Sequence, residues 1–167
     1  MRNKQKGFSL IELLIVVAII LIIAAIAIPN LLRSRMAANE ASAVGSVRTL
    51  NTAQVTYSTT YGTGFTTLAK LGGGAGCVAA PATACLIDPV LTAGTKSGYL
   101  LDTVPNTGSG TAIDPFVSYE VNGTPLSTSS GTRAFCSDQS GVIRYNVTGA
   151  AIGTGAGSCT AIPTILQ

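Results

Sequence analysis

A single carboxylate stands inside a long apolar run near the start of this 167-residue chain. Residues 8–28 read FSLIELLIVVAIILIIAAIAI and are apolar except for Ser9 and Glu12, and a basic head, MRNKQKG, precedes them. As a helix this run is about 31 Å long, close to the roughly 30 Å hydrocarbon core of a bilayer. A charge inside such a span costs about 2.5–3.5 kcal/mol and usually marks a functional partner. The alternative is an ordinary membrane anchor whose glutamate lies near water.

The order of the basic head and the apolar run argues against a standard secretory signal. In such a signal an apolar region of about 7–15 residues is followed by a small-residue cleavage site. Here the run is longer and ends at Pro29-Asn30, whereas the small residue Gly7 lies before it. Cleavage between Gly7 and Phe8 would remove the head and leave the apolar helix on the mature protein. A plain membrane anchor needs no cleavage upstream of its span.

The stretch KGFSLIELLIVVAIILIIAAIAIPN resembles the N-terminal signature of type IV pilins and of type II secretion pseudopilins. The resemblance implies that a prepilin peptidase cleaves after Gly7 and that the new N-terminal residue, Phe8, is methylated. It also implies that Glu12 is the glutamate that acts in assembly and that Pro29 marks a helix kink. The chain departs from the family at Leu21, where pilins often carry a glycine that loosens the helix.

The chemistry of Glu12 fits this role on physical grounds. Cleavage before Phe8 creates an α-amino group that is mostly cationic near neutral pH, whereas the uncut chain has only an amide nitrogen there. In a packed bundle, a neighbouring copy shifted along the axis brings its amine to Glu12, and a buried charge without its partner costs roughly 3–5 kcal/mol. The pair would set the stagger between copies. Cleavage would then act as an assembly switch, because it creates one half of the pair.

Composition argues against catalysis and against a nucleic-acid surface. The chain has no histidine, which removes Ser-His and Cys-His nucleophile pairs and the commonest zinc ligand. Its seven Asp and Glu residues are scattered along the sequence. Three of the ten Lys and Arg lie in the head, so seven remain against seven acidic residues after cleavage. We therefore expect a non-enzymatic protein with no cofactor, no metal site and no specific nucleic-acid partner.

Beyond Pro29 the sequence predicts that the helix continues and then packs on a sheet. Residues 30–61 are rich in alanine, and one face is marked every three or four residues by Val44, Val47, Leu50, Gln54, Tyr57 and Tyr61. From Gly62 onward short apolar runs predict a short helix at 65–71 and strands near 98–104, 116–122, 132–137 and 142–148. The predicted fold class is α+β, with a long N-terminal helix packed by its C-terminal half on an antiparallel sheet. This is the type IV pilin fold that the resemblance implies.

The expected organisation has four parts. They are a cleaved leader at 1–7, a transmembrane and filament-core helix at 8–29, its continuation at 30–61, and a periplasmic or extracellular β domain at 62–167. Within 116–122, alternation of Val117, Tyr119 and Val121 with polar residues predicts a half-buried strand. The turn composition of 137–141 predicts that the last two strands form a hairpin.

Four cysteines, Cys77, Cys85, Cys136 and Cys159, lie in the exported part. An even number in an oxidising compartment favours disulfides, and three connectivities are possible. We favour Cys77–Cys85 and Cys136–Cys159, because each closes a local loop rich in Gly, Ala and Thr that burial alone could not order. The second pair would resemble the disulfide-bound C-terminal loop of many pilins. Neither spacing is CxxC, which argues against metal ligation.

These observations together predict a prepilin, the structural subunit of a type IV pilus. It would be a single-pass protein of the inner membrane before assembly and part of a homo-oligomeric helical filament at the cell surface afterwards. Its expected partners are the prepilin peptidase and the pilus or secretion assembly machinery. A pseudopilin of a type II secretion system, in a periplasmic pseudopilus, is the close alternative. A membrane-anchored periplasmic domain that never polymerises is the third.

Overall fold

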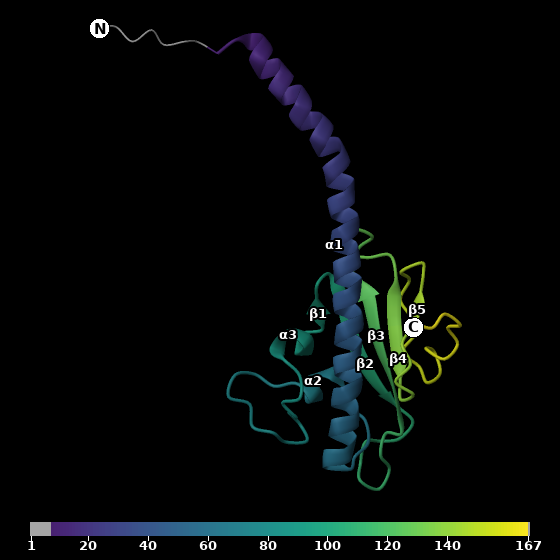
Figure 1. Ribbon diagram of the computed structural model, residues 1–167. Helices are drawn as coiled ribbons and strands as arrows, with labels where there is room; N and C mark the ends of the chain where they lie inside the picture. The colour runs from purple at the N-terminus through teal and green to yellow at the C-terminus, as the bar shows by residue number, and fades with distance from the viewer. Residues whose placement is uncertain (1–7, 167) are drawn as a thin grey trace. The chain divides into compact units, whose positions relative to one another are not determined.

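The protein is described by a computed structural model over residues 8–166, so the predicted leader, including Gly7, lies outside the described residues. Helix α1, Leu10–Tyr61, is 52 residues long (Figure 1). The chain divides into two compact units, the first ending at Arg35 and the second beginning at Met36. Helix α1 runs through this boundary and so contributes to both units. Pro29 lies inside α1, and the helix continues past it. Because proline has no N–H, one hydrogen bond is missing there, and the predicted kink stays a prediction.

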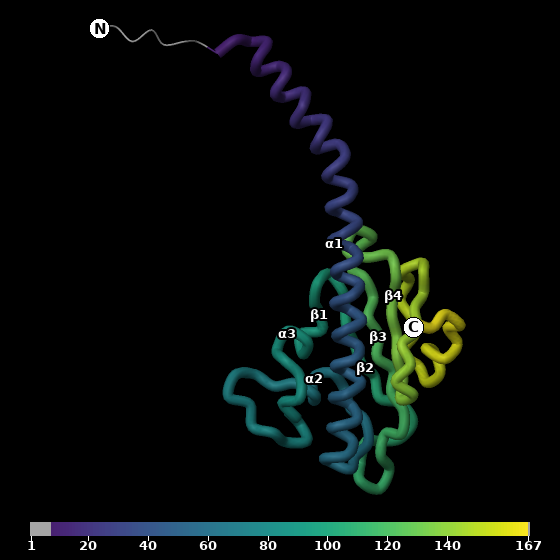
Figure 2. The backbone as a smooth tube through the Cα atoms, viewed as in Figure 1, coloured from purple at the N-terminus to yellow at the C-terminus, as the bar shows by residue number. Residues whose placement is uncertain are grey.

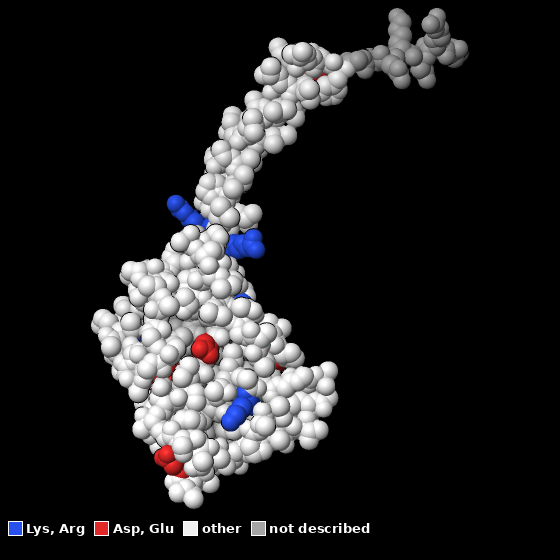
Figure 3. Space-filling view, turned by 180° about the vertical axis from the view of Figure 1, so that it is seen from behind, with Lys and Arg blue, Asp and Glu red and all other residues white. Residues whose placement is uncertain are grey.

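The N-terminal unit is a helix whose apolar side chains have no covering layer. Large hydrophobic residues from Leu10 to Leu32 are exposed, with Leu10 at 79% and Leu31 at 69%. Its surface is almost entirely white in the space-filling view, without exposed charge along most of its length (Figure 3). Among the described residues, α1 is the one helix long and apolar enough to cross a membrane. An apolar surface of this size marks a site of membrane or protein contact.

The second unit is built on a five-stranded antiparallel sheet whose strands lie side by side in chain order. Figure 2 traces this meander. The strands are β1 (Thr95–Lys96), β2 (Tyr99–Asn106), β3 (Ser118–Pro125), β4 (Ala134–Asp138) and β5 (Arg144–Asn146). The four predicted strands correspond to β2–β5, and β4 pairs with β5 as the predicted hairpin. The two-residue β1 and the one-turn helix α3, Pro89–Thr92, were not predicted.

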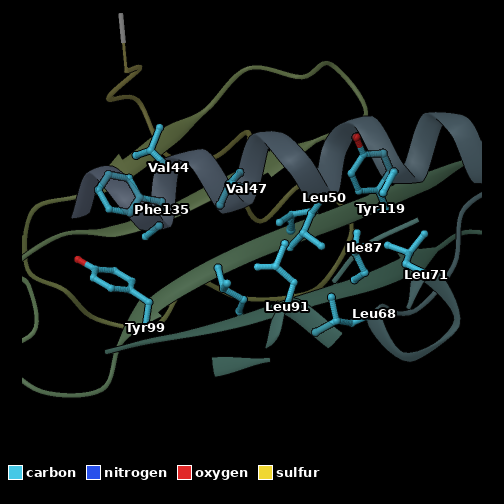
Figure 4. Close-up of a cluster of buried hydrophobic side chains, with 14 of the residues drawn as sticks. Val44, Val47, Leu50, Leu68, Leu71, Ile87, Leu91, Tyr99, Tyr119 and Phe135 are labelled. Atoms are coloured by element: carbon cyan, nitrogen blue, oxygen red, sulfur yellow. The ribbon is translucent and has the colours of Figure 1, made fainter. Parts of the chain in front are cut away.

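The C-terminal half of α1 covers one face of this sheet (Figure 1). The stripe predicted from the sequence is the face that it buries, and only Tyr61 at its end is partly exposed. The short helix α2, Leu68–Leu71, adds two buried leucines at the side. Figure 4 shows the core between helix and sheet, which includes Val44, Val47, Leu50, Tyr99, Tyr119 and Phe135. The predicted α+β fold class is confirmed, and the arrangement is pilin-like.

The opposite face of the sheet is covered by the C-terminal segment. This second, smaller core consists of Ala134, Cys136, Ile152 and Cys159, with Ile162 packed against it. As a result β3 is buried from Tyr119 to Gly123, more completely than the predicted half-buried strand. An alternating pattern shows which face of a strand is apolar, but it does not show what covers the polar face.

Glu120 of β3 lies under this C-terminal cover and is 1% exposed. Its Oε1 accepts a hydrogen bond from the backbone N–H of Gly157 at 2.9 Å, and its Oε2 accepts one from Cys159 at 3.1 Å. Burial raises the pKa of Glu120, and the nearby charge of Asp138 raises it further against these two hydrogen bonds. A buried carboxylate therefore holds the segment that carries Cys159.

Candidate functional site

The first turn of α1 contains a hydrogen bond that involves Glu12. Ser9 directly precedes the first helical residue, and its backbone N–H donates to Oε2 of Glu12 at 3.0 Å. This is one half of a capping box, in which a residue three positions into the helix satisfies a free N–H at its start. The bond was not predicted, although the Ser9-x-x-Glu12 spacing is its sequence signal. In the single chain, therefore, Glu12 already stabilises its own helix end.

Phe8 is the first of the described residues and directly precedes Ser9, at the N-terminal end of α1 where Glu12 lies. Its side chain is 79% exposed, so nothing within the described residues covers it. Oε1 of Glu12 accepts no hydrogen bond from residues 8–166, whereas Oε2 is bonded to Ser9. The carboxylate thus retains one oxygen for a donor from another molecule. Gly7, the other residue of the predicted cleavage site, lies outside the described residues.

Glu40 is the first buried residue of α1, counted from its N-terminal end. Its Oε1 accepts hydrogen bonds from the backbone N–H of Thr132 at 2.9 Å, from the Thr132 hydroxyl at 3.2 Å and from the backbone N–H of Arg133 at 3.2 Å. Its Oε2 accepts from Nε of Arg133 at 2.8 Å and pairs with Nη2 at 2.7 Å. We call Glu40, Thr132 and Arg133 the helix clamp. It joins α1 to a segment more than 90 residues further along the chain.

Electrostatics favour the charged form of Glu40 in the helix clamp. Burial by itself would raise its pKa, but the hydrogen bonds from Thr132 and the hydrogen bond and charge of Arg133 outweigh burial, so the pKa lies below its ordinary value. The Arg133 guanidinium also lies 5.6 Å from the ring centroid of Phe135 and 5.3 Å from that of Tyr145, within the range of cation–π attraction. The aromatic rings therefore hold the arginine that pairs with Glu40.

Gln54 forms a second polar anchor near the other end of the buried stripe. Its Nε2 donates to the carbonyl of Thr66 at 2.5 Å and to Oγ1 of Thr103 at 2.8 Å, and its Oε1 accepts from the N–H of Thr66 at 2.9 Å. Apolar side chains between the two anchors tolerate small shifts, whereas directional hydrogen bonds do not. Glu40 and Gln54 together set the rotation and axial position of this half of α1 on the sheet.

Two disulfides restrain the loops of the globular unit. Cys77 is bonded to Cys85 with Cα atoms 6.1 Å apart, and Cys136 to Cys159 with Cα atoms 5.7 Å apart. These are the pairs that the sequence favoured. The first closes an exposed loop, while the second is fully buried and ties the C-terminal segment to β4. Closing loops of this length adds on the order of 3 kcal/mol each.

Comparisons with known proteins agree with the N-terminal features. Residues 2–28 match the family described as the prokaryotic N-terminal methylation motif. The chain is 68% identical over 40 residues to the type IV wide pilus major component PilA4 of Thermus thermophilus, which is 24% of this chain and 30% of that protein. It is 46% identical over 54 residues to the type IV major pilin protein PilA of Myxococcus xanthus, which is 32% of this chain and 24% of that protein.

The similarity to these relatives is confined to a part of each chain. The matched segments span less than a third of the length of either curated relative. No solved structure shows a significant match. The chain therefore carries the methylation motif at residues 2–28 and has a pilin-like fold.

The helix clamp predicts acid-sensitive stability. The folded pKa of Glu40 lies below its ordinary value of 4.5, so its contribution is present at neutral pH and is lost as the pH falls through the folded pKa. Glu40→Gln keeps the shape but removes the charge that faces Arg133, and should lower the free energy of unfolding at pH 7 by on the order of 2–4 kcal/mol. The difference from wild type should shrink below about pH 4.5.

This prediction can be measured by denaturant unfolding of the full chain in nonionic detergent between about pH 3 and 7. Asp114→Asn is the matched control, because Asp114 is an exposed carboxylate outside the helix clamp. Glu120 has a raised pKa and acts with the opposite sign, so the comparison is between variant and wild type at each pH. A difference in unfolding free energy between Glu40→Gln and wild type that stays constant across the pH range would contradict the role of the Glu40 charge in the helix clamp.

Proposed function

We propose that this chain is a structural, non-enzymatic subunit of a type IV pilus. The observation that carries the proposal is the methylation motif at the head of a helix whose apolar first half is exposed and begins with one carboxylate. The two relatives are named as major components of pili, which favours a pilus over a secretion pseudopilus. Because the matches cover only part of each chain, a role as the major subunit is likewise a proposal for this protein.

In this proposal the subunit has a stored state and an assembled state. Residues 8–28 first span the inner membrane, where the apolar surface of α1 is stable. A peptidase removes the leader after Gly7, and Phe8 is methylated. The helix then leaves the membrane and packs against copies of itself in a filament at the cell surface. The exposed apolar side chains of α1 are buried in both states.

The geometry of the first turn supports the proposed pairing of Glu12 with a neighbouring amine. Oε2 stays on the Ser9 N–H, which fixes the direction of the carboxylate. Oε1 accepts a hydrogen bond from the charged α-amine of Phe8 of a neighbouring copy. A neighbour in the wrong axial position would leave both charges buried without partners, at roughly 3–5 kcal/mol. This penalty selects one stagger among the many that a uniformly apolar helix surface allows.

Processing provides the first test. The mass of the subunit from sheared filaments should equal residues 8–167 plus one methyl group, with all four cysteines oxidised. Gly7→Val should leave uncut precursor in the membrane, because a branched side chain crowds a peptidase site that accepts glycine. Intact-mass spectrometry of the filament and membrane fractions reads out both results. A filament subunit that retained MRNKQKG would refute the leader assignment.

Substitutions at Glu12 separate pairing from capping. Glu12→Gln keeps an acceptor for the Ser9 N–H but removes the charge, whereas Glu12→Leu removes both. If pairing with the amine drives assembly, both variants should lose most of their filament yield while cleaved subunit accumulates in the membrane. Glu12→Asp, which is one methylene shorter, should be intermediate. The readout is sheared filament against membrane pool, by immunoblot.

The exported domain is the internal control for these variants. It lies tens of residues from Glu12, so its disulfides and unfolding midpoint should not change, and insertion of Glu12→Leu should be at least as efficient as wild type. In a strain with no other pilin, normal assembly of Glu12→Gln would show that the charge is dispensable. The proposal of a pairing carboxylate would then fail, although the subunit would still be a filament subunit.

A further inference from the structure

The apolar stretch of α1 is followed by two arginines. Leu31 and Leu32 are the last large exposed apolar residues of the stretch, and Arg33 and Arg35 come directly after them. Both arginines are exposed. Within residues 8–166 the only ion pair joins Arg133 to Glu40, so neither Arg33 nor Arg35 has a carboxylate partner in the described chain.

The helical geometry places the two guanidinium groups on opposite sides of the helix. Each residue turns an α-helix by about 100°, so Arg33 and Arg35 differ by about 200°. Figure 3 shows basic side chains on either side of the helix where the white stretch ends. Side chains on an α-helix also lean toward its N-terminus, which here is the direction of the apolar stretch. Two long cationic side chains therefore surround the helix and reach back along it.

The distance of these two arginines from the apolar stretch, measured along the helix axis, lets their side chains reach the headgroup layer of a bilayer. If residues 8–28 fill the hydrocarbon core, Arg33 and Arg35 have Cα atoms about 8 and 11 Å beyond its edge, at 1.5 Å per residue. The headgroup layer is about 5–7 Å thick on each side. An arginine that leans back from this height brings its guanidinium into that layer, while its methylene groups cover the apolar surface of the helix.

We propose that Arg33 and Arg35 bind the phosphate groups of phospholipid headgroups at the outer face of the inner membrane. The planar guanidinium matches phosphate oxygens with two parallel hydrogen bonds, and anionic lipids add charge attraction. Among residues 8–166, the exposed carboxylates other than Glu12, which lies at the far end of the apolar stretch, are Asp88, Asp102 and Asp114 on the globular unit. The membrane surface, in contrast, is continuous with the apolar span. The two arginines hold the stored helix at one depth until assembly extracts it.

This inference rests on the membrane-stored state of the proposed function, but it does not require a filament. The test uses the complete chain without its leader, residues 8–167, in three environments. These are vesicles of phosphatidylethanolamine and phosphatidylglycerol, vesicles of the phosphate-free lipid digalactosyldiacylglycerol, and dodecyl maltoside micelles. Phenylglyoxal modifies free guanidinium groups, and mass spectrometry of peptides gives a modification rate for each arginine. Arg48 is the internal reference, because it is exposed and lies further along the same helix.

In phospholipid vesicles, Arg33 and Arg35 should react at least five-fold more slowly relative to Arg48 than they do in micelles, an effect of about 1 kcal/mol by the relation of ten-fold to 1.4 kcal/mol. The protection should be absent in digalactosyldiacylglycerol vesicles and should weaken in high salt. Equal protection in both kinds of vesicle would overturn the inference, since depth alone would then explain it. No protection in phospholipid would overturn it as well.

Flotation of the same vesicles separates this inference from the proposed function. Protein that floats with the vesicles but leaves Arg33 and Arg35 fully reactive contradicts only the phosphate contacts. Protein that fails to float contradicts the stored state, and both proposals fail with it. A variant that keeps the Arg48 reference, Arg33→Gln, should leave Arg35 protected in phospholipid.

Discussion

The apolar surface of the first half of α1 is the constraint on which the rest of the structure depends. Large hydrophobic side chains from Leu10 to Leu32 are exposed in the single chain. At roughly 25 cal/mol for each Å² of apolar area, such a surface is far too costly to leave in water. It needs a bilayer or other helices. Because both environments are apolar, a chain that uses them in turn can change its surroundings without refolding.

The two halves of α1 obtain specificity in different ways. The C-terminal half is positioned on the sheet by directional contacts within the chain, at Glu40 and Gln54. The apolar stretch of the N-terminal half, from Leu10 to Leu32, carries a single charged side chain, Glu12, in a surface of similar aliphatic groups. Aliphatic contacts stabilise many alignments almost equally, so one carboxylate can decide between them. In the proposed filament the same principle acts within the subunit and between subunits.

Hydrophobic periodicity over many residues predicted the buried stripe of α1, and short apolar runs predicted strands β2–β5. The α+β fold class followed from this order of elements together with the resemblance to type IV pilins. Periodicity did not predict the burial of Glu40 and Glu120. Their partners, Arg133 and the 157–159 turn, come from distant parts of the chain, and no local pattern marks a carboxylate as buried. The Ser9–Glu12 hydrogen bond is different, because the spacing of the two residues is a recognised signal for the start of a helix. It was not predicted, because the interpretation of Glu12 considered only its charge within the apolar run.

The central proposal is that the Phe8 amine of one copy pairs with Glu12 of a neighbour. A hydrophobic carbodiimide such as dicyclohexylcarbodiimide tests it directly, because it joins a carboxylate to an amine only when the two are in contact, and a methylated amine still reacts. In filaments assembled from a mixture of isotopically labelled and unlabelled subunits, the account predicts peptides in which Phe8 of one label is joined to Glu12 of the other. Monomers in detergent should give none. Filaments in which Glu12 reacts with the reagent but forms no link between copies would contradict the account.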